Sequence, residues 1–216
     1  MGKILRENKV FLYPFLIVWL LLAVILFVFH KATIHMAINQ FHTSYFDFLF
    51  KNITHLGDGL TPTFLALIFL FFSFRKAIIL GGSSLVAGLL AQFFKRAVFP
   101  DMLRPKAYLK DVELYLVPGV EVHDFFSFPS GHASTAFSMF MVLALFSRKK
   151  PVKLFCFLGA LLTGFSRIYL SQHFFVDVYF GAILGIVVAL FVYYFVYNAK
   201  GDWLDKSLTS LRTQNE

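Results

Sequence analysis

The chain has too few cysteines and too few charged residues for several common classes of protein. Cys156 is its only cysteine, which excludes an intramolecular disulfide and a CxxC-type metal or redox site. Only 15% of the residues are charged and 58% are hydrophobic, whereas soluble domains are about 45–50% apolar. With a mean hydropathy of +0.72, the 216 residues indicate a polytopic membrane protein with one domain, residues 1–216.

Metal-binding patterns and internal repeats are also absent from the sequence. The acids of the hydrophilic connection 95–131 do not form a recognisable carboxylate cage. We therefore expect neither a metal ion nor another cofactor. No convincing repeat is found, which disfavours a transporter or scramblase built from repeated halves.

Six apolar stretches predict an all-α protein with six transmembrane helices in one bundle. They cover roughly residues 11–29, 59–74, 77–94, 132–147, 154–171 and 174–197. Several are shorter than the about 20 residues of a full span unless flanking residues join them. The first stretch is long for a signal-peptide core and lacks a small-x-small cleavage pattern, so we expect an uncleaved helix.

Two further features concern how these helices are arranged. Residues 30–58 have mixed polarity and predict an amphipathic helix in the membrane interface, with an ordinary loop as the alternative. The small residues at 81–84, and Gly181 with Gly185, predict close helix–helix approach. For Gly181 and Gly185 a homodimer face is the alternative.

The basic residues are interpreted as a topology signal rather than a nucleic-acid site. The formal charge of +8 comes mostly from short connections between apolar stretches, a pattern that also suits anionic lipid headgroups. With a cytoplasmic N-terminus, 12 of the 20 Lys and Arg residues fall on the cytoplasmic side. We expect both termini in the cytoplasm and the 95–131 connection outside.

Polar residues at the boundaries of the apolar stretches suggest chemistry, because ionisable groups at membrane depth are costly. His173 and Asp177 are four residues apart, so on a helix they would share one face. The carboxylate could then accept a hydrogen bond from one ring nitrogen and raise the basicity of the other. His173 is therefore a candidate nucleophile, and a purely structural His–Asp pair is the alternative.

The tetrad from Pro129 to His132 stands where an apolar helix should begin. Ser130 is a good N-cap and Gly131 allows close backbone approach. Free N–H groups at a helix start favour a bound anion, and His132 could donate a proton to a leaving group. A capped helix with a histidine at headgroup level is the alternative.

Basic residues near this tetrad could supply donors to a phosphate, since arginine matches phosphate oxygens bidentately. The candidates are Arg104, Arg167, Lys95 and Arg96. Most other basic residues at span ends are interpreted as snorkelling anchors. The remaining histidines are interpreted as interfacial or loop residues, with His123 the first exception to consider: His30, His35, His42, His55 and His123.

Together these residues resemble the three-part signature of the type 2 phosphatidic acid phosphatase superfamily, K-x6-R-P, P-S-G-H and S-R-x5-H-x3-D. The second and third parts are intact at 129–132 and 166–177, within a resemblance that covers roughly residues 77–190. The first part departs, because Ala97 stands seven residues before Arg104 and Lys95 has eight residues between. An insertion near 100–102 would explain this, and Arg96 could substitute for Lys95.

The resemblance implies a metal-independent, integral-membrane lipid phosphatase. It implies that His173 forms a phosphohistidine, that Asp177 orients it, and that His132 protonates the leaving group and then activates water. The residues implied to hold the phosphoryl oxygens are Lys95, Arg104, Ser130, Gly131 and Arg167.

The implied substrate is a lipid phosphate, and the implied location is a bacterial inner membrane with the site facing the extracytoplasmic side. Undecaprenyl pyrophosphate ranks first, followed by phosphatidylglycerol phosphate, phosphatidic acid and the phosphate of lipid A. A lipid phosphotransferase with the same site and a non-enzymatic lipid transporter or scramblase are the alternatives. A vanadate-dependent haloperoxidase would share the anion pocket but is disfavoured by the six apolar stretches. The oligomeric state is left open.

Overall fold

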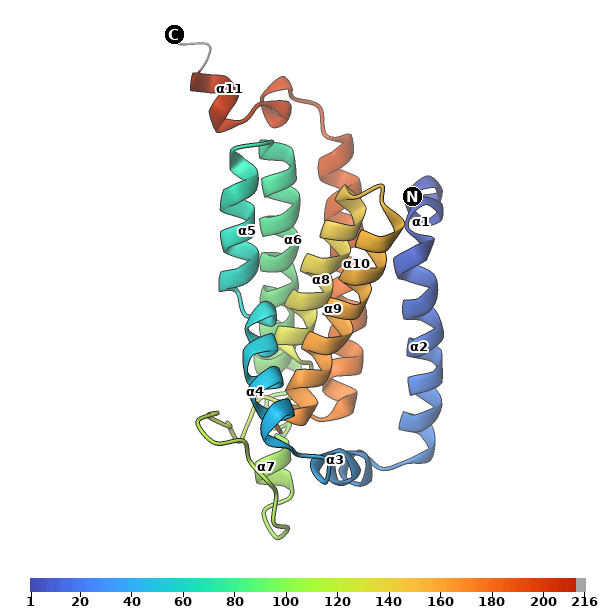
Figure 1. Ribbon diagram of the computed structural model, residues 1–216, viewed down its shortest axis with the longest axis vertical. Coiled ribbons are helices and arrows are strands. Elements are labelled where there is room, and N and C mark those ends of the chain that lie inside the picture. The colour runs from blue at the N-terminus through green and yellow to red at the C-terminus, as the bar shows by residue number, and fades with distance from the viewer. Residues whose placement is uncertain (213–216) are drawn as a thin grey trace.

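The computed structural model describes residues 1–212, which form helices and connections without a β-strand. The last four residues of the predicted domain lie outside this range. The predicted all-α bundle is confirmed (Figure 1). Its long axis is followed by six helices: α2 (Lys9–Val28), α5 (Leu60–Leu70), α6 (Phe74–Phe93), α8 (Gly131–Phe146), α9 (Lys150–Tyr169) and α10 (Phe175–Asn198).

The centre of the bundle is α8, in which 12 of 16 residues are buried. Its close neighbour α10 presents Gly181 and Gly185, and a Cβ added at Gly185 would lie 2.2 Å from the Ser134 carbonyl oxygen. Both glycines are buried against α8. The predicted close approach is therefore confirmed, and α8 of the same chain occupies the face that a homodimer would have used.

The number of full-length spans is smaller than the six predicted. Within residues 1–212, four helical stretches are long and apolar enough to cross a membrane: Lys9–Val28, Phe74–Val98, Lys150–Tyr169 and Phe175–Asn198. Helix α8 has 16 residues and α5 has 11. A fifth span arises if α4 (Ser44–Ile53), η1 (Thr54–Gly57) and α5 are joined, although they are bent by 53°. The bend follows Asp58, whose side chain accepts the backbone N–H groups of Leu60 and Thr61 and so starts a new helix.

Residues 30–58 form two helices rather than one, which makes the loop alternative wrong. Helix α3 (Lys31–Asn39) lies across the end of the bundle and α4 runs along its side (Figure 1). Thr43 separates them, because its hydroxyl accepts the Phe46 N–H and caps α4. Their buried residues are His35, Asp47 and Phe50.

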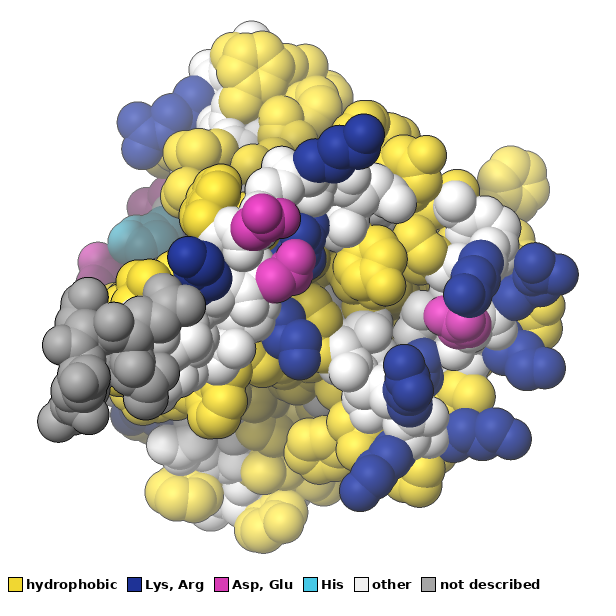
Figure 2. Space-filling model, turned by 90° about the horizontal axis from the view of Figure 1, so that it is seen from above, with side chains coloured by type: hydrophobic (Ala, Val, Ile, Leu, Met, Phe, Trp, Pro, Cys, Tyr) yellow, Lys and Arg dark blue, Asp and Glu magenta, His cyan; other side chains and the backbone are white. Residues whose placement is uncertain are grey.

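The N-terminus and the C-terminal end of the described residues lie at one end of the bundle, while α3, α7 (Pro105–Tyr108) and the 95–131 connection lie at the other (Figure 1). The terminal end also carries α1 (Gly2–Glu7), η3 (Asp202–Asp205) and α11 (Leu208–Arg212). Figure 2 shows many Lys and Arg side chains on this end. Arg75 joins its parts by donating to Asp205 at 2.7 Å and to the backbone oxygens that end α10.

Candidate active site

A cavity of about 690 Å³ collects most of the predicted site residues at the end of the bundle opposite the termini. Its walls come from α4, α5, α6, α8, α9, the short elements η1 and η2 (Phe94–Val98), and the connections beside them. Ser130 and Asp177 do not line the cavity but are buried beside residues that do. The predicted residues that line it are Lys95, Arg104, Gly131, His132, Arg167 and His173.

The start of α8 places His132 in this cavity. Ser130 is the N-cap, and its side chain accepts the Ala133 N–H at 3.4 Å, as predicted. The Ser130 N–H donates to the Asp177 carbonyl oxygen at 2.9 Å, which ties α8 to the first turn of α10. His132 therefore occupies the first turn of a helix whose N-cap is hydrogen-bonded to α10. The Ser130 hydroxyl is committed to the cap.

His173 does not share a helical face with Asp177, because it lies in the turn before α10. That helix begins at Phe175, and Asp177 folds back over its first turn. The His173 Nδ1 lies 3.5 Å from Asp177 Oδ2, longer than an ordinary N–H···O hydrogen bond. The same oxygen accepts the Phe174 N–H at 2.9 Å and the Ser127 hydroxyl. Asp177 thus stabilises the turn and faces Nδ1, which leaves Nε2 as the nitrogen available to a substrate.

The ionisation of His173 follows from its surroundings. Its side chain is 1% exposed, and burial of a charged imidazole is unfavourable. Burial, followed by repulsion from Lys95, Arg104 and Arg167, holds the pKa of His173 well below its usual value. The ring is therefore neutral at physiological pH, the form that can act as a nucleophile.

The two arginines of the cavity are joined by Gln172, which the sequence interpretation missed. Gln172 Oε1 accepts from Arg104 Nη1 at 3.1 Å and from Arg167 Nη2 at 3.3 Å. Arg104 also donates to the Phe125 carbonyl oxygen, and Arg167 donates to Thr54 Oγ1 at 2.7 Å. Within residues 1–212, neither guanidinium forms an ion pair with a carboxylate. Their positive charge is thus available to an anion.

The irregular spacing of the first motif is absorbed by a π-helix. Residues Phe94–Val98 form this element, η2, and the Phe99 N–H donates to the Phe94 carbonyl oxygen at 2.8 Å. Lys95 is 4% exposed and lines the cavity. Arg96 is exposed, and its guanidinium lies 5.9 Å from the ring of Phe126. The geometry therefore brings Lys95, and not Arg96, to the predicted phosphate-binding residues.

Other residues of the site carried no strong sequence signal. Gln172 and Ser127 are buried polar residues in connections, and only their nearness to His173 and Pro129 in sequence could have marked them. His55 and His123, interpreted as interfacial or loop residues, line the cavity. Within the described residues, no three His, Cys, Asp or Glu side chains are grouped so that they could bind a metal ion.

Comparison with known proteins identifies the family. The sequence model of the PAP2 superfamily matches residues 76–200, which are more than half of the chain. The chain therefore belongs to this superfamily. The resemblance inferred from the motifs is thereby confirmed.

Similar proteins include a phosphatidylglycerophosphatase and an undecaprenyl-diphosphatase. Phosphatidylglycerophosphatase B of Bacillus subtilis (strain 168) is 38% identical over 76 residues, which are 31% of this chain and 37% of that protein. The chain thus spans little more than a third of this relative. Undecaprenyl-diphosphatase BcrC of the same organism is 28% identical over 156 residues, 71% of this chain and 77% of that protein. The crystal structure of Aquifex aeolicus LpxE has a TM-score of 0.66 and 29% identity, covering 74% of this chain and 92% of LpxE.

Proposed function

We propose that the chain is an integral-membrane lipid phosphatase that hydrolyses a lipid phosphomonoester or pyrophosphate through a phosphohistidine. The observation that carries this proposal is the convergence of His132, His173 and three cations on one cavity at the end of an apolar bundle. Phosphoryl transfer needs positive charge around the phosphoryl oxygens and a nucleophile in line with the leaving group. The cavity offers both.

In the first step, Nε2 of His173 attacks phosphorus and the bond from phosphorus to the leaving oxygen breaks. His132, protonated once the anion is bound, gives its proton to that oxygen. In the second step, His132 takes a proton from water, the water oxygen attacks phosphorus, and the N–P bond breaks. Inorganic phosphate leaves and both histidines return to their starting forms. Because the phosphoryl group is held by side chains, no step requires a metal ion.

The phosphoryl oxygens are held by Lys95, Arg104 and Arg167, with the backbone of Gly131 at the start of α8. Ser130 contributes by capping that helix rather than through a contact of its hydroxyl with phosphate. Asp177 faces Nδ1 of His173 and stabilises the imidazolium-like charge that develops during attack.

The proposed substrate is undecaprenyl pyrophosphate or a glycerophospholipid phosphate such as phosphatidylglycerol phosphate or phosphatidic acid. Two of the similar proteins, a phosphatidylglycerophosphatase and an undecaprenyl-diphosphatase, support these two classes. In the proposed topology the short helix α8 and the bent α4–α5 pair complete six spans in the inner membrane. Both termini then lie in the cytoplasm and the cavity faces the extracytoplasmic side, which the basic terminal end supports.

The test is release of inorganic phosphate by purified protein and by a His173→Ala variant, assayed on both lipid classes in detergent. We expect the variant to release phosphate at less than about one thousandth of the wild-type rate, since removing a nucleophile typically costs more than that. Wild-type activity in a folded His173→Ala variant would refute the proposal. Transfer of labelled phosphate to a second lipid, without release of free phosphate, would identify the phosphotransferase instead.

A further inference from the structure

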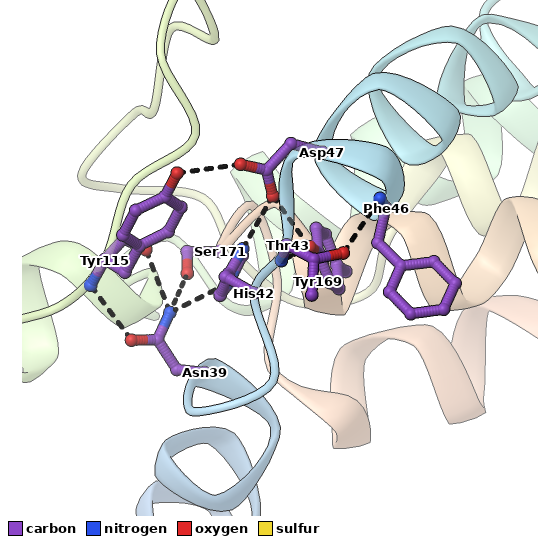
Figure 3. Close-up of polar contacts among 8 residues, drawn as sticks. All are labelled: Asn39, His42, Thr43, Phe46, Asp47, Tyr115, Tyr169 and Ser171. Carbon is purple, nitrogen blue, oxygen red and sulfur yellow. Dashed lines mark hydrogen bonds and ion pairs between the residues drawn. The ribbon is translucent and has the colours of Figure 1, made fainter.

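A second polar cluster lies beside the cavity but contributes none of the residues assigned to catalysis. We call it the Asp47 network (Figure 3). It joins α3, α4, the 95–131 connection and the C-terminal end of α9. Six of its members are drawn in Figure 3: Asn39, His42, Asp47, Tyr115, Tyr169 and Ser171. The seventh member is His35, whose ring lies within hydrogen-bond distance of Ser171.

Asp47 is the centre of this network and accepts three side-chain hydrogen bonds. The donors are Tyr169 Oη at 2.7 Å, Tyr115 Oη at 2.7 Å and His42 Nδ1 at 3.0 Å. The His42 ring is held between the two tyrosine rings, with centroid distances of 4.4 Å to Tyr115 and 4.1 Å to Tyr169. A buried carboxylate with three donors is strongly stabilised in one position, so Asp47 fixes three separate segments relative to one another.

The network reaches the turn that carries His173 through Ser171. The Ser171 hydroxyl lies 3.1 Å from His35 Nε2 and accepts from Asn39 Nδ2 at 3.4 Å. The backbone of Ser171 has a φ of +53°, a left-handed conformation that is uncommon for serine. Such a conformation persists when surrounding contacts determine it. Tyr169, two residues earlier, is bound to Asp47, so both ends of this short stretch are anchored before the chain reaches His173.

The 95–131 connection is anchored to the same cluster. The amide of Asn39 exchanges two hydrogen bonds of 2.9 Å with the backbone of Tyr115. Six residues beyond Tyr115, the Glu121 carbonyl oxygen accepts from Gln172, the residue that precedes His173 and joins the two cavity arginines. The turn formed by residues 169–173 is therefore hydrogen-bonded to α3 and α4 and also to the 95–131 connection.

From these contacts we infer that Asp47 is a positioning residue for catalysis, which holds the 169–173 turn so that His173 is aimed at phosphorus. This inference rests on the proposed function of His173. Asp47 does not line the cavity, so it acts through Tyr169, His42 and Tyr115 rather than on substrate. Small displacements of a reacting group from its productive geometry lower the rate strongly, by about a hundredfold for 1 Å. Loss of the Asp47 carboxylate should therefore lower kcat more than it raises KM.

The experiment compares Asp47→Asn and Tyr169→Phe with the wild type, using dioctanoyl phosphatidic acid or undecaprenyl pyrophosphate, whichever the wild-type protein hydrolyses. Asn keeps the shape of Asp but loses the charge, and Phe removes one donor. We expect kcat to fall by about tenfold and KM to stay within about twofold. Tyr13→Phe is the matched control, since Tyr13 is 62% exposed on α2, and it should leave both constants unchanged.

A second readout separates positioning from general stability. Hydrogen exchange of the peptide containing residues 169–174 should become faster in Asp47→Asn while exchange in α8 stays as in the wild type. If Asp47→Asn folds poorly, Tyr115→Phe is the substitute, because Tyr115 lies in a connection and is 46% exposed. Its kcat should fall by about threefold.

A wild-type kcat in folded Asp47→Asn and Tyr115→Phe, even with a lowered melting temperature, would overturn the inference and leave the network a purely structural one. The proposed function fails separately, through an active His173→Ala variant. An inactive His173→Ala with fully active Asp47→Asn would refute the positioning role alone.

Discussion

A single change at Gln172 tests whether the positive charge of the cavity binds the substrate. Gln172→Glu is almost isosteric, and the new carboxylate would keep both acceptor contacts, to Arg104 at 3.1 Å and to Arg167 at 3.3 Å. It would lose the hydrogen bond that Gln172 Nε2 donates to the Glu121 carbonyl oxygen, so circular dichroism first checks that the variant is folded. The added negative charge would offset one of the three cations that a phosphate needs, and it would repel the phosphate itself.

The expected loss can be worked from Coulomb's law. Two unit charges about 6 to 8 Å apart interact by about 2 to 3 kcal/mol at an effective dielectric constant of 20. Each 1.4 kcal/mol corresponds to about tenfold, so kcat/KM should fall by about 30- to 150-fold. Most of the loss should appear in KM, because the phosphate group is charged in the ground state as well as in the transition state.

The assay is phosphate release over a range of lipid concentrations in detergent micelles. Gln40→Glu is the matched control, since it introduces the same charge at an exposed position that does not line the cavity. A kcat/KM for Gln172→Glu within about threefold of the wild type would refute the reasoning. It would mean that the guanidinium groups do not hold the phosphoryl oxygens at their observed positions.

Two further predictions use paired substitutions. Lys95→Gln should lower kcat/KM by about a hundredfold, because Lys95 is buried in the cavity wall. Arg96→Gln should lower it by less than about threefold, because Arg96 is exposed. Equal losses in a phosphate-release assay would contradict the assignment of Lys95 as the phosphate-binding residue. Gly185→Ala should cost about 1 to 3 kcal/mol of stability and lower the melting temperature, because its Cβ would meet the Ser134 carbonyl oxygen at 2.2 Å. Gly82→Ala, whose Cβ would meet its first neighbour at 4.0 Å, is the control and should melt as the wild type does.

The features best predicted from the sequence were those with a local cause. The apolar stretches gave the helices of the bundle because hydrophobic length is read directly from the chain. Ser130 was predicted as an N-cap because its side chain bonds to a residue three positions away. The glycines at 181 and 185 were predicted as contact points because small residues permit close approach between membrane helices.

The features that were missed depend on contacts between distant segments. Arg104 and Arg167 were predicted, but the Gln172 that links them was not, because a lone glutamine in a connection has no characteristic pattern. His42 was interpreted as a loop or interfacial residue and does lie in the connection between α3 and α4, but the packing of its ring between two tyrosines from other segments was missed. The pairing of α4 with α5 across the 53° bend was also missed, since residues 30–58 have mixed polarity and were assigned to the membrane interface rather than to a span. Spatial neighbours of this kind follow from the tertiary fold and not from spacing along the chain.

His132 and His173 differ in the structural elements that hold them in the cavity. His132 is carried by α8, the innermost helix, whose faces are covered by neighbours and whose first turn is tied to α10. His173 is carried by a short turn whose anchors, α3 and the 95–131 connection, lie at the periphery of the bundle. Strain applied from the surrounding lipid, from detergent or from a substitution in the outer helices would therefore displace His173, the proposed nucleophile, before it displaced His132, the proposed proton donor. We expect harsh detergents to lower kcat first, while the protein is still helical. Binding of a phosphate analogue should be lost only at higher detergent concentrations.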